Sequence, residues 1–215
     1  MKAYLFPGQG SQAKGMGKAL FDQFPEMVAQ ADRVLGYSIR DLCLLDADKQ
    51  LNQTQFTQPA IYVVNALAYQ DKLASSAKPD FVAGHSLGEF NALLAAGCFD
   101  FETGLRLVQK RAQLMSLAAE GGMAAVLNMS SEKIAEVLAA NQLTEVDIAN
   151  YNTPSQTVIS GSKQQIAQAQ PYFQVDNALY IPLNTSGAFH SRFMAPARDE
   201  FEAFLAGFSF RSPSL

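Results

Sequence analysis

Gly84-His85-Ser86-Leu87-Gly88 lies between the short apolar run Phe81-Val82-Ala83 and a helical stretch from Glu89 to Ala96. A strand, a tight turn with a glycine on either side of a serine, and a helix form the pattern of a nucleophile elbow. The small residues let the backbone fold closely and lift the serine Oγ into solvent. We therefore predict that Ser86 is a nucleophile; the alternative is a serine on an ordinary loop.

The segments on either side favour an α/β fold. Ala3 to Phe6 reads as a strand that Pro7-Gly8 ends, and helical patterns cover 18–24, 25–35 and 59–73, with Pro59 suited to a first turn. Strands that alternate with helices in this way indicate a largely parallel sheet. We expect an α/β-hydrolase-like core.

From Met123 the pattern changes to βαββαβ, the order of a ferredoxin-like domain. The strands are predicted at 123–129, 146–150, 156–160 and 179–183, and the helices at 131–140 and 163–173. We predict that residues 123–184 form a small inserted subdomain. Residues 1–122 and 185–215 would form the large core, which closes with a helix around 196–208.

A serine hydroxyl needs a base to take its proton, and the chain has two histidines. His85 adjoins Ser86, but neighbouring side chains at a tight turn point apart, so a structural role suits it better. His190, in Thr185-Ser186-Gly187-Ala188-Phe189-His190-Ser191, is the candidate base. The alternative for His190 is a structural histidine.

The oxyanion hole of such a site is built from backbone N–H groups. One donor is the residue after the nucleophile, Leu87. The glycine-rich loop Gly8-Gln9-Gly10 after the first strand allows close approach, and its Gln9 N–H is the natural second donor. A phosphate-binding loop is the rival interpretation, but the glycine spacing fits neither the P-loop nor the dinucleotide pattern.

Arg111 stands out on the helix that begins at Phe101. On a helical wheel it falls on the apolar face with Leu107 and Leu114, opposite a polar face made of Glu102, Arg106, Gln109, Lys110 and Gln113. A guanidinium there needs a partner, because an unpaired buried charge is costly. Either an internal carboxylate pairs with it, or a substrate carboxylate fits its fork.

Composition excludes several classes of protein. The chain has 215 residues with 16 basic and 20 acidic side chains, a net charge of −4, and 48% apolar residues. No basic run exceeds two residues, so we expect no nucleic-acid partner. No apolar run approaches the ~20 residues of a membrane span, and no secretory signal is evident. Cys43 and Cys98 lie in apolar surroundings, so we expect buried free thiols in a reducing cytoplasm, and no His/Cys cluster suggests a metal site.

Four ordered motifs together resemble the malonyl-CoA:acyl-carrier-protein transacylases, and especially the discrete, trans-acting acyltransferases of polyketide synthases. They span residues 6–191 and are Phe6-Pro7-Gly8-Gln9-Gly10-Ser11-Gln12, Gly84 to Phe90, Gln109-Lys110-Arg111 and Gly187 to Ser191. The stretch from Asn150 to Gln156 also resembles an Asn-rich segment of the family. Members of this family serve polyketide or fatty-acid synthesis.

The resemblance implies a ping-pong transfer of malonyl from malonyl-CoA to the phosphopantetheine thiol of a holo acyl carrier protein. Ser86 would be acylated, His190 would be the base, Arg111 would hold the malonyl carboxylate, and Gln9 and Leu87 would form the oxyanion hole. Phe189 resembles malonyl-selective members. One thioester is exchanged for another, so no metal, ATP or other cofactor is implied. We expect a cytoplasmic monomer.

The sequence departs from the family after Ser209, where family members add further strands and a glutamine that orients the histidine. We therefore expect exposed apolar sheet surface in this chain. Two alternatives to transfer stay open: a serine hydrolase that clears acyl groups from carrier proteins, and an inactive carrier-protein-docking module. Arg111 argues against the hydrolase, because neutral acyl chains offer no partner for a buried cation.

Overall fold

The computed structural model describes residues 1–117, 121–175 and 177–215. The chain divides into two compact units. The first comprises Met1–Gln113 and Ala203–Leu215, and the second comprises Leu114–Glu202. Along the part of the chain that the structure describes, no helix is both long and apolar enough to cross a bilayer.

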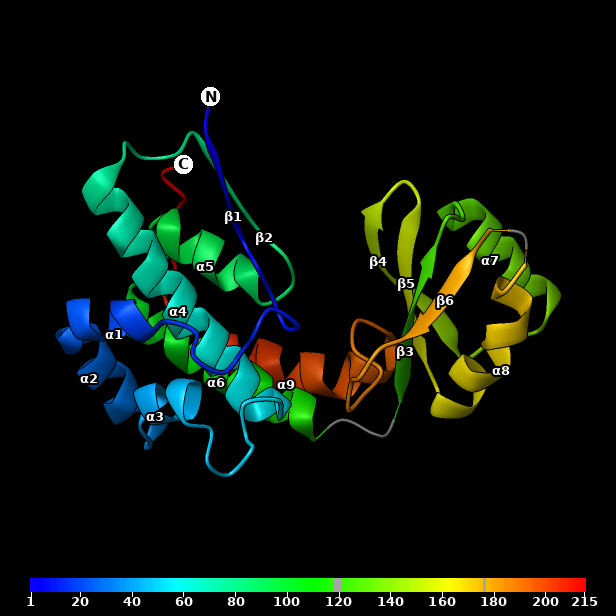
Figure 1. Ribbon diagram of the computed structural model, residues 1–215, viewed down its shortest axis with the longest axis horizontal. Coiled ribbons are helices and arrows are strands. Elements are labelled where there is room, and N and C mark those ends of the chain that lie inside the picture. Colours follow the sequence, from blue (N-terminus) through cyan, green and yellow to red (C-terminus); the bar gives the residue numbers. More distant parts are fainter. Residues whose placement is uncertain (118–120, 176) are drawn as a thin grey trace. The chain divides into compact units, whose positions relative to one another are not determined.

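The elements follow the α/β order predicted from the sequence (Figure 1). Up to residue 116 they are β1 (Ala3–Phe6), α1 (Lys18–Gln23), α2 (Pro25–Leu35), α3 (Ile39–Leu44), α4 (Thr54–Ser75), β2 (Phe81–Gly84), α5 (Gly88–Ala95) and α6 (Phe101–Ser116). After residue 121 they are β3 (Gly122–Leu127), α7 (Ser131–Ala140), β4 (Val146–Thr153), β5 (Gln156–Gly161), α8 (Lys163–Phe173), β6 (Leu179–Pro182), η1 (Arg192–Met194) and α9 (Ala195–Leu205).

The first unit contains a parallel pair of strands, β1 and β2, in which Phe6 lies opposite Gly84. One face of this pair packs on α4 and α5 through a cluster that includes Phe6, Tyr69 and Ala92. The other face carries Leu5 and Phe81, which are 77% and 59% exposed. The structure thus confirms the expectation of exposed apolar sheet surface.

Helix α4 begins earlier than predicted. The prediction that Pro59 stands in its first turn is wrong, because the backbone N–H groups of Phe56 and Thr57 already donate to the Gln53 carbonyl, each at 2.8 Å. The Thr57 hydroxyl also donates to the carbonyl of Leu51 at 2.6 Å. The helix therefore continues through Pro59.

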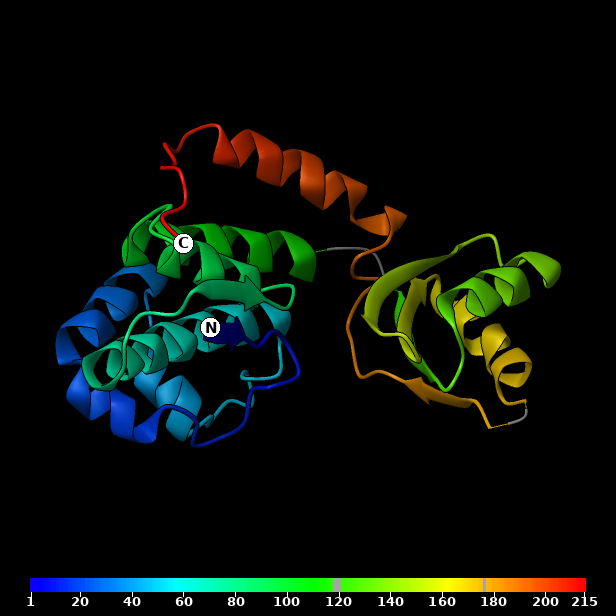
Figure 2. The same ribbon diagram turned by 90° about the horizontal axis from the view of Figure 1, so that it is seen from above.

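The second unit contains an antiparallel sheet in the order β4-β5-β3-β6. Helices α7 and α8 cover one face of it, as the turned view in Figure 2 shows. They pack on the sheet through Ile134, Leu138, Ile166 and Phe173. This arrangement confirms the predicted ferredoxin-like order βαββαβ.

The second unit extends beyond the predicted subdomain 123–184. It also takes in 114–117, 121–122 and 185–202, which were predicted to belong to the large core. The reason lies in packing: Phe189 and Met194 join a cluster with Val158 on the face of the sheet opposite α7 and α8.

Candidate active site

Ser86 lies on the turn between β2 and α5, as the elbow pattern predicts. Its φ of 52° is left-handed, a conformation that costs roughly 1–2 kcal/mol for an L-residue. Such strain is held only where the surroundings fix the backbone, and it is typical of functional sites. The structure confirms the strand–turn–helix context on which the prediction rested.

The two glycines of the elbow are required by close backbone contact. A Cβ at Gly84 would lie 1.9 Å from the carbonyl carbon of Gly88, and a Cβ at Gly88 would lie 2.0 Å from the carbonyl oxygen of Phe6. No side chain fits in either place. The turn therefore depends on glycine to pack α5 against both β1 and β2.

The loop after β1 lies directly against the elbow. A Cβ at Gly8 would lie 2.3 Å from the carbonyl oxygen of His85, whose backbone N–H donates to the carbonyl of Phe6 at 3.0 Å. Gln9 follows in this loop, and its side-chain amide donates to the Thr54 hydroxyl at 3.3 Å. The loop with Gln9 thus adjoins the turn with Leu87. Their role as oxyanion donors stays a prediction.

Arg111, on α6, reaches the elbow within the same unit. Its Nη1 donates to Oε1 of Gln58 at 2.5 Å, and its Nη2 donates to Oγ of Ser86 at 3.1 Å. Its Cζ lies 5.8 Å from the centroid of the Phe90 ring. The guanidinium therefore has neutral hydrogen-bond partners. Among the described residues no carboxylate forms an ion pair with it, so the internal salt bridge considered above does not form there.

Burial lowers the pKa of Arg111 from its ordinary value to about 10, and the nearby Glu89 carboxylate acts in the opposite direction. The group still carries its charge near neutral pH. An arginine held this way has lost part of its hydration without gaining an anionic partner. A carboxylate that approaches Ser86 would supply that partner.

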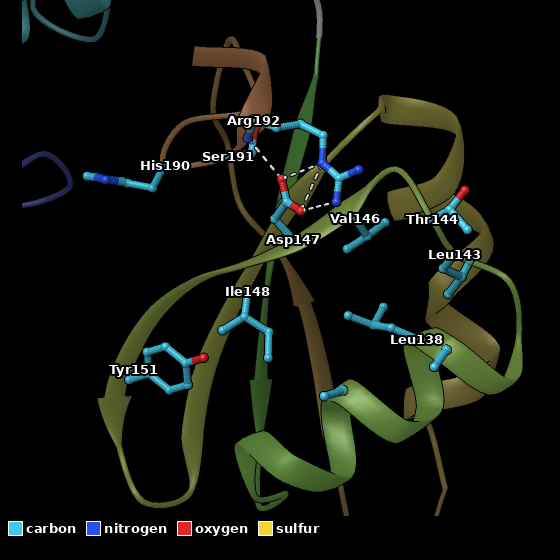
Figure 3. A pocket seen from close by; sticks show the side chains of 12 residues that line it. Leu138, Leu143, Thr144, Val146, Asp147, Ile148, Tyr151, His190, Ser191 and Arg192 are labelled. Atoms are coloured by element: carbon cyan, nitrogen blue, oxygen red, sulfur yellow. Dashed lines mark hydrogen bonds and ion pairs between the residues drawn. The ribbon is translucent and has the colours of Figure 1, made fainter. Parts of the chain in front are cut away.

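His190 belongs to the second unit and lies on an exposed turn before η1. Its φ of 59° is left-handed like that of Ser86. It borders a pocket of about 760 Å³ within this unit, whose other walls include Leu138, Val146 and Tyr151. Figure 3 shows the imidazole extending away from the side chains of Asp147 and Arg192. The role of His190 as a base stays a prediction.

Phe189, the predicted selectivity residue, is 5% exposed. It packs in the second unit with Met123, Ala125 and Val158. The ring is thus part of a hydrophobic cluster, and its effect on selectivity stays a prediction.

Comparison with known proteins supports the family resemblance found in the sequence motifs. The model of the acyl transferase domain family matches residues 3–215 of the chain. The chain belongs to the acyl transferase family.

Among similar proteins are two curated relatives of this acyl transferase. The chain is 57% identical to the polyketide biosynthesis malonyl CoA-acyl carrier protein transacylase PksC of Bacillus subtilis, with 100% of this chain and 76% of the relative covered. It is 53% identical to the corresponding protein BaeC of Bacillus velezensis, with 100% and 75% covered. A crystal structure of malonyl CoA-acyl carrier protein transacylase from Burkholderia pseudomallei is 60% identical, with a TM-score of 0.97 and coverage of 99% and 73%. This resemblance confirms the family inferred from the sequence motifs.

Three buried polar side chains of this acyl transferase, Gln58, Asn65 and Asn91, were not predicted from the sequence. Gln58 is fully buried beside Arg111. Asn65 donates to the carbonyl of Pro7 and to Oδ1 of Asn91, both at 3.1 Å, and Asn91 donates to the carbonyl of Tyr62 at 3.0 Å. These bonds tie α4 and α5 to the loop that precedes Gln9. Gln58 and Asn65 share with Arg111 the sequence signal of a polar side chain among apolar neighbours on a helix, so the same signal could have identified them.

Proposed function

We propose that this acyl transferase moves a malonyl group from malonyl-CoA to the phosphopantetheine thiol of a holo acyl carrier protein, through an ester on Ser86. The observation that carries the proposal is the contact of Arg111 with Ser86. A cation within hydrogen-bond distance of the acylated oxygen provides a partner for an acyl group that ends in a carboxylate. The two curated relatives carry this activity in their names.

The first half of the reaction forms the ester. His190 takes the Ser86 proton as Oγ attacks the thioester carbonyl. The N–H groups of Gln9 and Leu87 stabilise the oxyanion of the tetrahedral intermediate, and one such donor contributes about 3–4 kcal/mol in comparable sites. The C–S bond breaks, and the CoA thiolate takes the proton from the His190 imidazolium. Malonyl-Ser86 and free CoA result.

The second half reverses these steps with a new thiol. The carrier-protein thiol gives its proton to His190 and attacks the ester carbonyl. The Ser86 oxygen leaves and recovers the proton from His190. Since a thioester enters and a thioester leaves, the reaction needs no ATP, redox group or metal.

Arg111 gives the site its preference for a dicarboxylic acyl group. Its two outer nitrogens match the two oxygens of a carboxylate, and such charge-assisted pairs are roughly twice as strong as neutral hydrogen bonds. When malonyl binds, the carboxylate would replace the neutral partners Gln58 and Ser86 at the guanidinium. We also propose that the protein is a monomer in the cytoplasm. The buried free thiols of Cys43 and Cys98 support a reducing compartment.

One product analysis separates this function from its two alternatives. The protein is mixed with malonyl-CoA and holo carrier protein, and CoA, malonate and malonyl carrier protein are measured by mass spectrometry. Malonyl carrier protein in amounts that match the released CoA is the expected result. Free malonate as the main product would identify a hydrolase. If malonyl-CoA stays intact while the carrier protein binds, the protein is a docking module.

A further inference from the structure

Besides the packing of Phe189 on the small sheet, one carboxylate joins the turn that carries His190 to that sheet by hydrogen bonds. The backbone N–H of Arg192 donates to Oδ2 of Asp147 at 2.8 Å, and Nε of Arg192 lies 3.0 Å from both carboxylate oxygens. Nη2 of Arg192 completes the ion pair. Figure 3 shows these bonds on one side of the turn and the His190 imidazole on the other. Asp147 thus holds both the backbone and the side chain of a residue two positions after His190.

Asp147 is itself rigidly placed. It lies on β4 opposite Ser160 of β5, and its neighbours Val146 and Ile148 pack into the core beneath α7 and α8. Its side chain is 23% exposed, whereas that of Arg192 is 60% exposed. The carboxylate of Asp147 is therefore the less exposed partner, and the more exposed Arg192 side chain extends to it.

The turn needs such an anchor because its backbone is strained. A left-handed residue other than glycine costs of order 1–3 kcal/mol and persists only where its surroundings hold it, and His190 is such a residue. On its C-terminal side Ser191 contributes two local bonds: its Oγ donates to the Ala188 carbonyl at 2.6 Å and accepts from the Phe193 N–H at 3.3 Å. The bonds to Asp147 connect residue 192 with a strand 45 positions earlier.

We propose that Asp147 is a positioning residue for the reaction and that it fixes His190 through Arg192. The inference rests on the proposed function, in which His190 is the base. A base must be held within a few tenths of an ångström to take and return a proton efficiently, and a misplacement of about 1 Å can cost about 100-fold in rate. The sheet, rather than the turn alone, sets the place of the imidazole.

The kinetic test measures the rate of serine acylation with saturating malonyl-CoA. Asp147→Ala and Arg192→Ala are expected to lower this rate about 10- to 100-fold, while the malonyl-CoA concentration at half-saturation changes less than about twofold.

The double variant should be no slower than either single one, because both remove the same interaction. Asp147→Asn keeps an acceptor for the Arg192 N–H and should lose less. Glu136→Gln, which breaks the exposed Lys133–Glu136 pair of the same unit, is the control and should leave the rate unchanged.

The second readout observes the imidazole itself. Since the chain has two histidines, its NMR spectrum has two imidazole signals, and His190→Gln assigns them by removing one. In Asp147→Ala the His190 signal is expected to shift or split into several conformers, and the His85 signal should stay in place. A general loss of folding would move both.

Each result supports or overturns the inference. If His190→Ala abolishes acylation while Asp147→Ala neither slows it nor moves the His190 signal, Asp147 has no positioning role and the proposed function stands. If His190→Ala acylates at the normal rate, the base assignment fails, and the positioning inference fails with it. Additive losses in the double variant would likewise overturn an action through the Asp147–Arg192 pair.

Discussion

Nη2 of Arg111 lies 3.1 Å from Oγ of Ser86, although the two residues are 25 positions apart in the sequence. The contact places a partly buried cation beside a serine on a strained turn. A serine nucleophile alone is compatible with many acyl groups. The adjacent guanidinium favours acyl groups that end in an anion.

Arg111→Ala should therefore lose malonyl transfer selectively. We expect kcat/KM for malonyl-CoA to fall about 100-fold. This loss corresponds to roughly 3 kcal/mol, which is a typical cost of removing one partner of a desolvated charge pair. Acetyl-CoA lacks the carboxylate and should be much less affected. Steady-state kinetics with both esters measure the difference. Arg106→Ala, which breaks an exposed pair with Glu102 on the same helix, is the matched control. Equal losses with both esters would mean that Arg111 is structural.

Gly88→Ala should disrupt the elbow. The added methyl group would lie 2.0 Å from the carbonyl oxygen of Phe6, so β1 or α5 must move, at a cost of about 1–3 kcal/mol or more. We expect a lower melting temperature together with loss of serine acylation. Gly207→Ala adds the same methyl group where the nearest atom is 3.5 Å away and should change neither. A fully active Gly88→Ala protein would contradict the close packing of the elbow.

The elbow could be predicted from sequence because its determinants are local. Gly84, Ser86 and Gly88 fix one turn, and the apolar runs around them fix the strand and the helix. The order of the small sheet was predictable for a similar reason, since alternation and helical period mark each of its elements. Helix α3, from Ile39 to Leu44, was not predicted.

Features that depend on long-range packing could not be predicted from sequence. The turn with His190 was assigned to the large core, yet Phe189 packs on the small sheet. The bond between Asp147 and Arg192 joins residues 45 positions apart, and neither residue belongs to a recognisable motif. Arg111 was found because a charge on an apolar face is conspicuous in any sequence, but its partner Gln58 was not identified.

The Asp147–Arg192 pair should make stability depend on pH in a definite sense. Hydrogen bonding to Arg192 lowers the pKa of Asp147 below its usual 3.8. A carboxylate whose pKa is lowered by folding stabilises the protein above its unfolded-state pKa, and that contribution disappears as the pH falls through the folded-state value. Asp147→Asn should therefore lower the melting temperature at pH 7 and have a smaller effect at an acid pH below the folded-state pKa, where the native carboxyl is also protonated. Thermal unfolding at both pH values measures this. An equal loss at both would show that charge plays no part in the pair.

Phe189→Ser should raise the share of methylmalonyl transfer, because it replaces a ring beside His190 with a small side chain. The ring is buried, so the change also leaves a cavity, and Phe→Ala substitutions of this kind cost about 3–5 kcal/mol. Val158→Ala opens a smaller cavity in the same cluster and serves as the control. Competition between malonyl-CoA and methylmalonyl-CoA gives the product ratio. A shift in both variants would trace the effect to loosened packing, and no shift in either would place selectivity elsewhere.

Intact-mass analysis after mixing with malonyl-CoA tests the central claim most directly. The wild-type protein is expected to gain one malonyl group, located at Ser86 by peptide mapping and lost again when holo carrier protein is added. Ser86→Ala should stay folded, because the Arg111 bond to Gln58 remains, and should gain no malonyl group. An adduct that persists in Ser86→Ala, or that maps to another residue of the wild-type protein, would contradict the assignment of Ser86 as the acylated nucleophile.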